Sequence, residues 1–352
     1  MVEYIKSLPD VWESLKNCET PVVLYGMGDG ADKVLSAFEK YGIKASAVMA
    51  SDDFVRGQSF RGFKVKKLSE LETELGSFTV ALCFASQLPG VMSAIKTVAQ
   101  KHPMYVPSVP VFGDLLFDGG FLNKFAVDIE KAYALLADEQ SRRVYKNVLS
   151  FYRTGRISLL DEITTGKDEA FGDILKLNGN EVYVDLGAYN GDTIDEFLKY
   201  SNGSYRKIVA LEPNAKNFEK LKAHCADMEK VELWQLGAYS RNTVLKFNNK
   251  AGRNSAIAGS GVETHVAAVD SILCGTAASY IKADVEGADY DTLLGMQKTL
   301  KNYKPQLNFS AYHRFEDIFR LPLLINELNP DYKIHLRHHP YIPAWDTNLY
   351  CV

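Results

Sequence analysis

The stretch Glu181-Val-Tyr-Val-Asp185-Leu-Gly187-Ala-Tyr-Asn190-Gly191-Asp192-Thr193 decides how the rest of the chain is interpreted. Its first part is apolar and rich in β-branched and aromatic side chains, which suits a parallel strand buried on both faces. The two glycines then allow a close approach to a ligand and a positive φ angle. The stretch therefore predicts a strand, a turn, and a helix whose first N–H groups lack partners inside the helix.

Two classes of ligand could use this turn. A dinucleotide site needs a G-x-G-x-x-G pattern and places a pyrophosphate at the helix N-terminus. Here Asp185 ends the strand and Asp192 begins the helix, and two carboxylates would repel a pyrophosphate but suit a cation. S-adenosylmethionine carries a sulfonium and an ammonium group, so it fits these two carboxylates better than a dinucleotide does. The alternative is a buried strand with a capping Asp in some other α/β protein. We assign cofactor contacts to Asp185, Gly187, Ala188, Tyr189, Asn190, Gly191, Asp192 and Thr193.

The bulk properties of the chain limit its class. Its 352 residues are enough for two domains. A formal charge of −4 argues against nucleic-acid binding, which needs a basic surface. No apolar run of membrane-spanning length and no signal-peptide pattern is present. The five cysteines are scattered and lack a C-x-x-C pair, so we expect reduced thiols in the cytoplasm. A homodimer is compatible with the sequence.

Residues 1–115 predict a small Rossmann-like domain whose ligand the sequence leaves open. After its first strand, Gly26-Met-Gly28-Asp-Gly30-Ala31 fits the dinucleotide pattern loosely, and Asp52 and Asp53 follow the second strand. The turn could bind a nucleotide or only connect strand and helix. The expected strands of this first domain alternate with helices and lie at 21–25, 45–49, 63–65, 78–84 and 104–106. The pattern of residues 116–180 predicts a helical connector after it.

Residues 181–352 predict a second α/β domain whose strand ends carry polar residues. The second strand, at 207–211, ends in Glu212-Pro213-Asn214, where a lone carboxylate can accept both hydroxyls of a ribose. The third strand ends in Gly237-Ala238, a pair small enough to leave room for an adenine. Residues 252–261 predict a glycine-rich loop that could act as a lid.

The fourth and fifth strands of this domain carry the candidate catalytic groups. Asp284 and Glu286 follow one strand, and Tyr312-His313 follows the next. A histidine has a reference pKa of about 6.5, so His313, assisted by Asp284, could serve as a general base. Asp284, Glu286 and His313 could instead hold Mg²⁺. Alternatively, Asp284 or Asp289 could simply cap the helix expected at 290–301. We assign substrate contacts to Tyr312 and Arg337, although Arg337 could equally pair with an acid at the sheet edge.

Together these motifs resemble the FkbM-type S-adenosylmethionine-dependent methyltransferases. The resemblance covers about residues 130–352 and implies a seven-stranded methyltransferase sheet, mostly parallel with one reversed strand. It also implies O-methylation of a hydroxyl on a sugar or small natural product. The matching segments are Val184-Asp-Leu-Gly-Ala-Tyr-Asn-Gly-Asp-Thr193, Leu211-Glu-Pro-Asn214, Ile281-Lys-Ala-Asp-Val-Glu-Gly-Ala288, Tyr312-His313, Leu336-Arg-His338 and Asp346-Thr-Asn-Leu-Tyr350.

The chain departs from the family pattern at two positions. Asp289 stands where a Glu is usual, which shortens the reach of that side chain, and Ala283 stands where Met or Val is usual. The N-terminal unit resembles those fused to some bacterial relatives. Two other functions stay open: an NAD(P)-dependent oxidoreductase that uses the turn from Gly26 to Ala31, and a non-catalytic regulator that senses its ligand.

Overall fold

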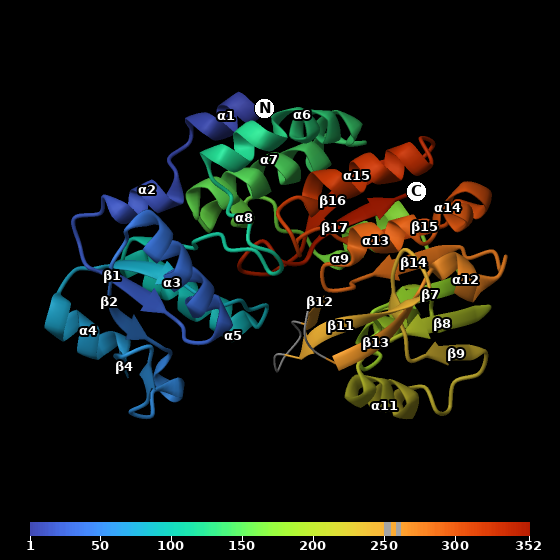
Figure 1. The fold of residues 1–352 in the computed structure, drawn as a ribbon, viewed down its shortest axis with the longest axis horizontal. Helices are drawn as coiled ribbons and strands as arrows, with labels where there is room; N and C mark the ends of the chain where they lie inside the picture. Colours follow the sequence, from blue (N-terminus) through green and yellow to red (C-terminus); the bar gives the residue numbers. More distant parts are fainter. Residues whose placement is uncertain (250–254, 258–261) are drawn as a thin grey trace.

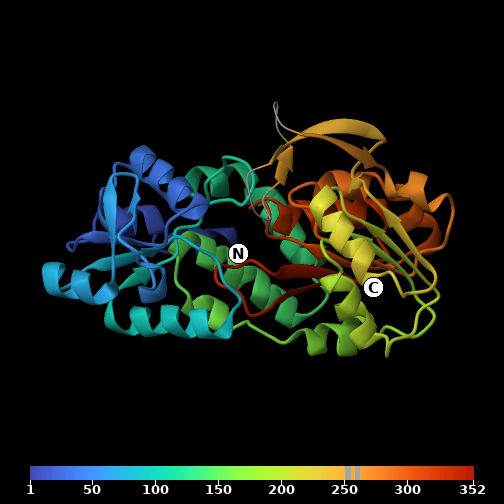
Figure 2. The same ribbon diagram turned by 90° about the horizontal axis from the view of Figure 1, so that it is seen from below.

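The computed structural model describes residues 1–249, 255–257 and 262–352. Two α/β units lie at opposite ends of the molecule, and a layer of helices joins them (Figures 1 and 2). The predicted class of two Rossmann-like units is confirmed. The glycine-rich loop predicted at 252–261 lies outside the described residues, apart from the short strand at 255–257.

The N-terminal unit is built on a six-stranded sheet in the order β3-β4-β2-β1-β5-β6. All neighbouring strands are parallel except β3 with β4. Its helices are α3 (Asp29–Tyr41), α4 (Leu68–Leu75), α5 (Pro89–Lys101) and the short 3₁₀ turn η1 (Asp52–Phe54). Its strands are β1 (Val22–Tyr25), β2 (Ala45–Met49), β3 (Ser59–Phe60), β4 (Phe63–Lys66), β5 (Thr79–Leu82) and β6 (Met104–Tyr105).

The helical layer between the sheets is formed mainly by α6 (Gly119–Leu135) and α7 (Glu139–Thr154). Asp138 separates these helices because its side chain accepts the N–H of Ser141 at 2.6 Å and caps α7. Helix α6 packs on α15 and α7 packs on β16, so this layer belongs to the face of the C-terminal sheet. The shorter elements are α1 (Val2–Ser7), α2 (Val11–Lys16), α8 (Ser158–Asp161), α9 (Lys167–Glu169) and the π-helical turn η2 (Ala170–Leu175).

The C-terminal unit is built on a seven-stranded sheet in the order β16-β17-β15-β14-β7-β8-β9. Strand β17 runs antiparallel to both of its neighbours, and the other neighbouring pairs are parallel. The predicted sheet with one reversed strand is therefore confirmed. Its strands are β7 (Val182–Leu186), β8 (Lys207–Leu211), β9 (Val231–Trp234), β14 (Tyr280–Ala283), β15 (Gln306–Ser310), β16 (Ile334–His338) and β17 (Thr347–Cys351).

Helices cover both faces of this sheet, as its apolar strands require. Alternate residues of β7 point to opposite faces: Tyr183 packs with α10 and α11, whereas Val184 and Leu186 pack with the helices of the other face. The helices are α10 (Asp192–Tyr200), α11 (Ala215–His224), α12 (Val269–Leu273), α13 (Asp289–Leu294), α14 (Gln297–Tyr303) and α15 (Asp317–Leu328).

A small four-stranded sheet in the order β10-β13-β11-β12 projects from the C-terminal unit (Figure 1). The pair Gly237-Ala238, expected at the end of the third strand, forms β10 of this sheet and pairs with β13. Its strands are β10 (Gly237–Ala238), β11 (Thr243–Asn249), β12 (Ser255–Ile257) and β13 (Val262–Ala267).

Two further expectations concern the whole molecule. All five cysteines lie in the described residues, and each is a free thiol. Among the helices of the described residues, none is long and apolar enough to cross a membrane.

Candidate active site

The carboxyl ends of four adjacent parallel strands bring the predicted polar residues to one edge of the sheet. Strands β8, β7, β14 and β15 lie side by side in that order. They end next to Glu212, Asp185, Asp284 and His313, respectively. Sites in open α/β sheets form at this edge, where the order of the strands reverses.

The turn after β7 has a backbone that requires its glycines. Gly187 has a φ of +88°, and a Cβ atom there would lie 2.1 Å from the carbonyl oxygen of Asp284. Gly191 has a φ of +98°, and its Cβ atom would lie 2.5 Å from the ring of His224. Tyr189 also has a positive φ, of 48°. The glycines therefore let the turn pass directly beside the end of β14.

Asp185 has a different place from the one expected. Its side chain is fully buried, and its Oδ2 accepts the hydroxyl hydrogen of Thr193 at 2.5 Å. Lys282 is its neighbour on β14. Burial raises the pKa of Asp185, while the positive charge of Lys282 opposes that rise. Through Oδ2 the carboxylate ties the end of β7 to the first turn of α10. Its buried Oδ1 has no hydrogen-bond partner among the described residues, so a direct contact between Asp185 and the cofactor stays a prediction.

Glu212 holds the neighbouring turn in place. Its Oε2 accepts the N–H of Tyr189 at 3.0 Å, and its Oε1 accepts the N–H of Asn214 at 2.8 Å. Burial raises the pKa of Glu212, and these two backbone N–H groups oppose the rise. Each carboxylate oxygen has two acceptor positions, so each can still accept one hydroxyl.

The other predicted cofactor residues differ in what they contact. Asn214 caps α11 by accepting the N–H groups of Lys216 and Asn217 at 3.0 and 3.2 Å. Asp192 is exposed and accepts the N–H of Thr193 at 3.0 Å. Ala188 is buried, and Asn190 has a buried Oδ1 with no hydrogen-bond partner among the described residues. Gly237 packs against Pro213 and Val266, and the adjacent Ala238 is buried.

His313 lies between two carboxylates. Its Nε2 is 3.0 Å from Asp284 Oδ1, and its Nδ1 is 2.8 Å from Asp289 Oδ2. The side chains of His313 and Asp289 are 1% and 0% exposed, whereas that of Asp284 is 33% exposed. Asp284 is therefore the member of this chain that a bound molecule can reach.

The charges in this chain of hydrogen bonds favour a protonated imidazole. Burial alone would lower the pKa of His313, but Asp289 and Asp284 outweigh it and hold the pKa well above its ordinary value. Burial alone would raise the pKa of Asp284, but Lys282 and His313 outweigh it and lower that pKa. An imidazolium with both N–H groups directed at carboxylates has no free lone pair. This geometry favours Asp284 over His313 as the proton acceptor, and the role of His313 as general base stays a prediction.

The donor chemistry does not suit the Mg²⁺ site considered from the sequence. His313 Nε2 already faces Asp284, and it lies 3.8 Å from Glu286. A second group, Asp289, His313 and Asp317, has ligand atoms within 4.8 Å of one another. Burial and the nearby Asp289 raise the pKa of Asp317 to about 8. Within this group the structure shows a contact between His313 Nδ1 and Asp289, and Asp317 accepts the N–H of Arg314 at 2.9 Å.

The two predicted substrate residues have different outcomes. Tyr312 is partly exposed, and its hydroxyl group lies 3.4 Å from Asp284 Oδ1. Arg337 is only 5% exposed and binds Asp138 and Glu169, each at 2.9 Å. These two ion pairs occupy its guanidinium group, and a contact between Arg337 and the substrate stays a prediction. It pairs with acids at the sheet edge, which was the structural alternative.

Part of the sequence matches the model of a known protein family. The family model described as the methyltransferase FkbM domain matches residues 185–340. The chain carries an FkbM methyltransferase domain. The resemblance to the FkbM-type S-adenosylmethionine-dependent methyltransferases is confirmed, and the protein is an enzyme of this type.

One solved structure shares the fold over nearly the whole chain. The crystal structure of a methyltransferase FkbM from Methylobacillus flagellatus KT is similar over 99% of this chain and 95% of that chain, with a TM-score of 0.74 and 20% identity. Aeropyrum pernix fibrillarin with natively bound S-adenosyl-L-methionine matches 51% of this chain and 68% of that chain (TM-score 0.33, 9% identity). A precorrin-6y C5,15-methyltransferase from Geobacter metallireducens GS-15 matches 54% and 92% (TM-score 0.34, 12% identity). No curated protein matches the sequence.

A segment from outside the FkbM domain closes one side of its site. Phe112, between β6 and α6, donates its N–H to the carbonyl oxygen of His313 at 3.0 Å. Its ring centroid lies 5.9 Å from that of His313. Gly287 makes room for Phe112, because a Cβ atom there would lie 2.9 Å from the Phe112 ring. The N-terminal half of the chain therefore helps to bury His313.

The N-terminal glycine turn packs against its own sheet. A Cβ atom on Gly26 would lie 2.8 Å from the ring of Phe84, and one on Gly30 would lie 2.2 Å from the carbonyl oxygen of Cys83. Asp52 and Asp53 are exposed on η1. Gly26 and Gly30 are therefore required by the close packing of β1 and α3 on the end of β5. A bound nucleotide is not needed to explain why these two positions are glycines.

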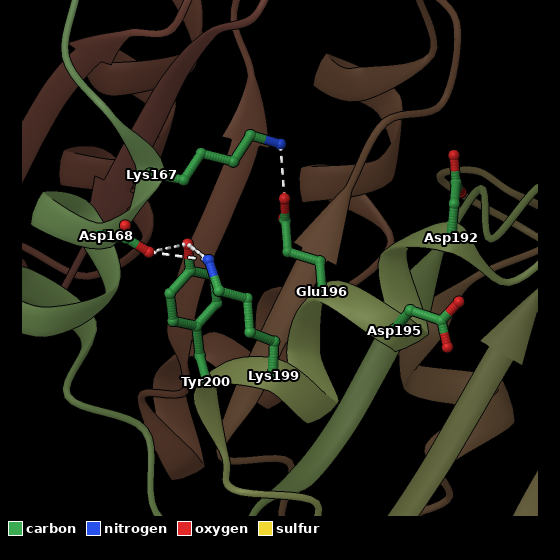
Figure 3. Close-up of a pocket in the computed structure, with 7 residues that line it drawn as sticks. All are labelled: Lys167, Asp168, Asp192, Asp195, Glu196, Lys199 and Tyr200. Carbon is green, nitrogen blue, oxygen red and sulfur yellow. Dashed lines mark hydrogen bonds and ion pairs between the residues drawn. The ribbon is translucent and has the colours of Figure 1, made fainter.

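A charged hollow of about 500 Å³ lies beside α10 in the FkbM domain (Figure 3). Lys167 pairs with Glu196 at 2.6 Å, and Lys199 pairs with Asp168 at 2.9 Å. Asp192, predicted to contact the cofactor, lines this hollow but points away from the paired side chains (Figure 3). Because these ion pairs compensate one another and join α9 to α10, we assign no ligand to them.

Three residues of the site were missed from the sequence. Asp289 was noted only as a departure and a helix cap, although it is the third acid of Asp284-Val-Glu-Gly-Ala-Asp289. Lys282 is a charged residue within the apolar strand β14, which is a signal that it needs a buried partner. Phe112 carries no local signal, because its role depends on a contact with His313 about 200 residues further along the chain.

Proposed function

We propose that this methyltransferase transfers a methyl group from S-adenosylmethionine to a hydroxyl group of a sugar or small natural product, with Asp284 as the proton acceptor. The observation that carries the proposal is the chain of hydrogen bonds from Asp289 through His313 to the partly exposed Asp284. Asp284 follows β14, which is adjacent to β7 and its turn, and Glu212 follows β8 on the other side of β7.

The residues around the strand ends fit the cofactor. Glu212 can accept two ribose hydroxyls in addition to its two backbone N–H groups. Asn190 Oδ1 is buried without a donor, which is costly unless a bound molecule supplies one. The ammonium and hydroxyl groups of S-adenosylmethionine are such donors. Asp185 positions Thr193 and the turn, and the backbone at Gly187 leaves space beside Asp284.

When bound, S-adenosylmethionine supplies an electrophilic methyl group on a positively charged sulfur. The protein has to hold the acceptor oxygen in line with that group and receive the hydroxyl proton. Asp284 is ionised, because Lys282 and His313 lower its pKa. A weakly basic carboxylate suffices here, because the hydroxyl proton becomes strongly acidic as the oxygen forms its new bond.

His313 and Asp289 act through Asp284. The bond from His313 Nε2 fixes the orientation of the Asp284 carboxylate, and the bond to Asp289 fixes the imidazole ring in turn. Buried Phe112 excludes water from the back of the histidine. We therefore assign His313 and Asp289 as positioning residues, with Asp284 and Tyr312 facing the acceptor.

The division of the chain supports this assignment. We propose that residues 181–352 form the methyltransferase domain, that residues 1–115 form a small Rossmann-like domain, and that the connector at 116–180 fixes one against the other. The partner is a small-molecule or glycan acceptor.

The proposal is tested by ligand-dependent melting of the full chain. S-adenosylmethionine and S-adenosylhomocysteine should each raise the melting temperature, because a ligand that binds only the folded state stabilises it. NAD⁺ and NADP⁺ should leave it unchanged. A shift with a nicotinamide cofactor alone would overturn the proposal in favour of an oxidoreductase that uses the turn at Gly26.

A further inference from the structure

A cavity of about 300 Å³ lies between the two α/β units, next to the candidate active site. The N-terminal unit contributes the turn after β1, the end of β5 and the segment at 106–111. Helix α7 and the loops around Tyr312 and Trp345 complete the wall. Ligand sites of small-molecule enzymes commonly form at such boundaries between units.

One wall of the cavity is aromatic. The rings of Tyr312 and Trp345 lie nearly parallel, at 19°, with centroids 6.4 Å apart. Tyr341 continues this wall, with its ring centroid 5.8 Å from that of Trp345. Flat aromatic surfaces of this kind bind the apolar face of a ring-shaped ligand.

Among the described residues that line the cavity, Ser108 has a buried side-chain oxygen without a hydrogen-bond partner. Ser108 is 6% exposed and lines the cavity, and its Oγ forms no hydrogen bond with the described residues. A buried hydroxyl without a hydrogen-bond partner destabilises the protein. A ligand that donates or accepts one hydrogen bond at Ser108 would remove that cost.

The charges that line the cavity compensate one another. Lys33 pairs with Asp29 at 3.0 Å and donates to the carbonyl oxygens of Pro110 and Val111 at 3.3 and 2.8 Å. Asp29 also lies in the first turn of α3, where its negative charge opposes the binding of an anion. The cavity therefore favours a neutral molecule over a nucleoside diphosphate sugar.

The cavity meets the reaction site at Tyr312. This side chain lines the cavity, and its hydroxyl group reaches Asp284 at 3.4 Å. A molecule seated against Tyr312 and Trp345 would place a hydroxyl substituent at the tip of Tyr312, beside the proton acceptor.

We propose that this cavity is the acceptor site and that the acceptor is a neutral, ring-bearing alcohol or glycoside, stacked on Tyr312 and Trp345 and hydrogen-bonded to Ser108. This inference rests on the proposed O-methyltransferase function and gives the N-terminal unit a role in acceptor selection. It assigns the choice of substrate to residues outside the FkbM domain as well as within it.

Calorimetric titration of the full chain with 4-nitrophenyl β-D-glucopyranoside tests the inference without requiring turnover. This probe is uncharged and carries both a flat ring and hydroxyl groups. Ser108→Ala should weaken binding of the probe by about fivefold, and Trp345→Leu should weaken it by about tenfold. Ser93→Ala, an exposed serine on α5, is the matched control and should bind the probe as the wild type does.

UDP-glucose is the charged comparison and should bind at least tenfold more weakly than the glucoside. Tighter binding of UDP-glucose, or equal affinity of the wild type and both cavity variants for the glucoside, would overturn the inference. Neither titration depends on S-adenosylmethionine. The melting experiment with S-adenosylmethionine therefore tests the methyl-transfer function separately from the acceptor site. Glucoside binding that needs Ser108, without any shift by S-adenosylmethionine, would leave the cavity site standing and remove the methyl-transfer function.

Discussion

Replacing Glu212 with Gln probes the proposed grip on the cofactor. In the wild type, both carboxylate oxygens are held by backbone N–H groups, at 3.0 Å from Tyr189 and 2.8 Å from Asn214. Each hydrogen bond from a ribose hydroxyl to this charged group contributes about 1.5–3 kcal/mol, against about 0.5–1.5 kcal/mol for a neutral acceptor. Loss of the charge on two such bonds removes about 2–3 kcal/mol, which weakens S-adenosylmethionine binding by about 30- to 150-fold.

The assay is calorimetric titration of S-adenosylmethionine into the full chain. Glu219→Gln provides the matched control, because Glu219 is an exposed acid on α11 that pairs only with Lys222 among the described residues. Its affinity should equal that of the wild type. The amide group introduced by Glu212→Gln would also oppose one backbone donor, so circular dichroism must show that the variant is folded. A folded Glu212→Gln protein with an affinity within threefold of the wild type would refute the assignment.

Three further predictions, with four variants, test other parts of the structure. Gly187→Ala should destabilise the protein by about 3 kcal/mol in a denaturant titration, because its Cβ atom would meet the carbonyl oxygen of Asp284. Gly203 also has a positive φ, but a Cβ atom there would lie in open space, so Gly203→Ala should lower stability by only about 1 kcal/mol. Equal losses of stability in the two variants would disprove the steric explanation. Arg337→Leu should also lower stability by about 3 kcal/mol, because it leaves Asp138 and Glu169 without their partner; a variant as stable as the wild type would argue against a structural role. Asp317 has its pKa raised to about 8, so the folded state binds its proton more tightly than the unfolded state. Stability should therefore fall from pH 6 to 9 in the wild type and less steeply in Asp317→Asn; parallel pH curves would argue against a buried neutral carboxyl.

The strand pattern and the glycine turns account for what the sequence could predict. Buried parallel strands are nearly continuous apolar runs, so β7, β8, β14 and β15 were visible locally. Their polar residues follow each strand end directly, which explains why Glu212, Asp284 and His313 were expected at one edge of the sheet. The reversed strand was implied by the family resemblance and not by periodicity.

The direction and partners of side chains could not be read from the same pattern. Asp185 was expected to face a ligand, but the alternation of β7 turns it towards α10 and Lys282. Arg337 was expected near a substrate because a strand-end cation is available for binding. Its partners Asp138 and Glu169, both partly exposed, lie about 200 and 170 positions earlier in the sequence. Pairings of this kind depend on tertiary contacts that a local sequence pattern does not contain.

The protonation of His313 illustrates the same limit. The sequence places a histidine and an acid on neighbouring strands, which is compatible with a free base. The structure adds Asp289 on the other ring nitrogen, and this second carboxylate raises the pKa of His313. We therefore propose Asp284 as the proton acceptor because of Asp289, a residue that the sequence pattern presents only as a possible helix cap.

Methyl transfer to oxygen can be followed directly with S-adenosylmethionine that carries a ¹³C-labelled methyl group. The full chain is incubated with this cofactor and a panel of neutral hydroxylated ring compounds, and mass spectrometry locates the label. The wild type should form a labelled methyl ether, and Asp284→Asn should form it about 10²- to 10⁴-fold more slowly. Equal rates in the two proteins would contradict the account, and so would cofactor binding without a labelled ether from any compound of the panel.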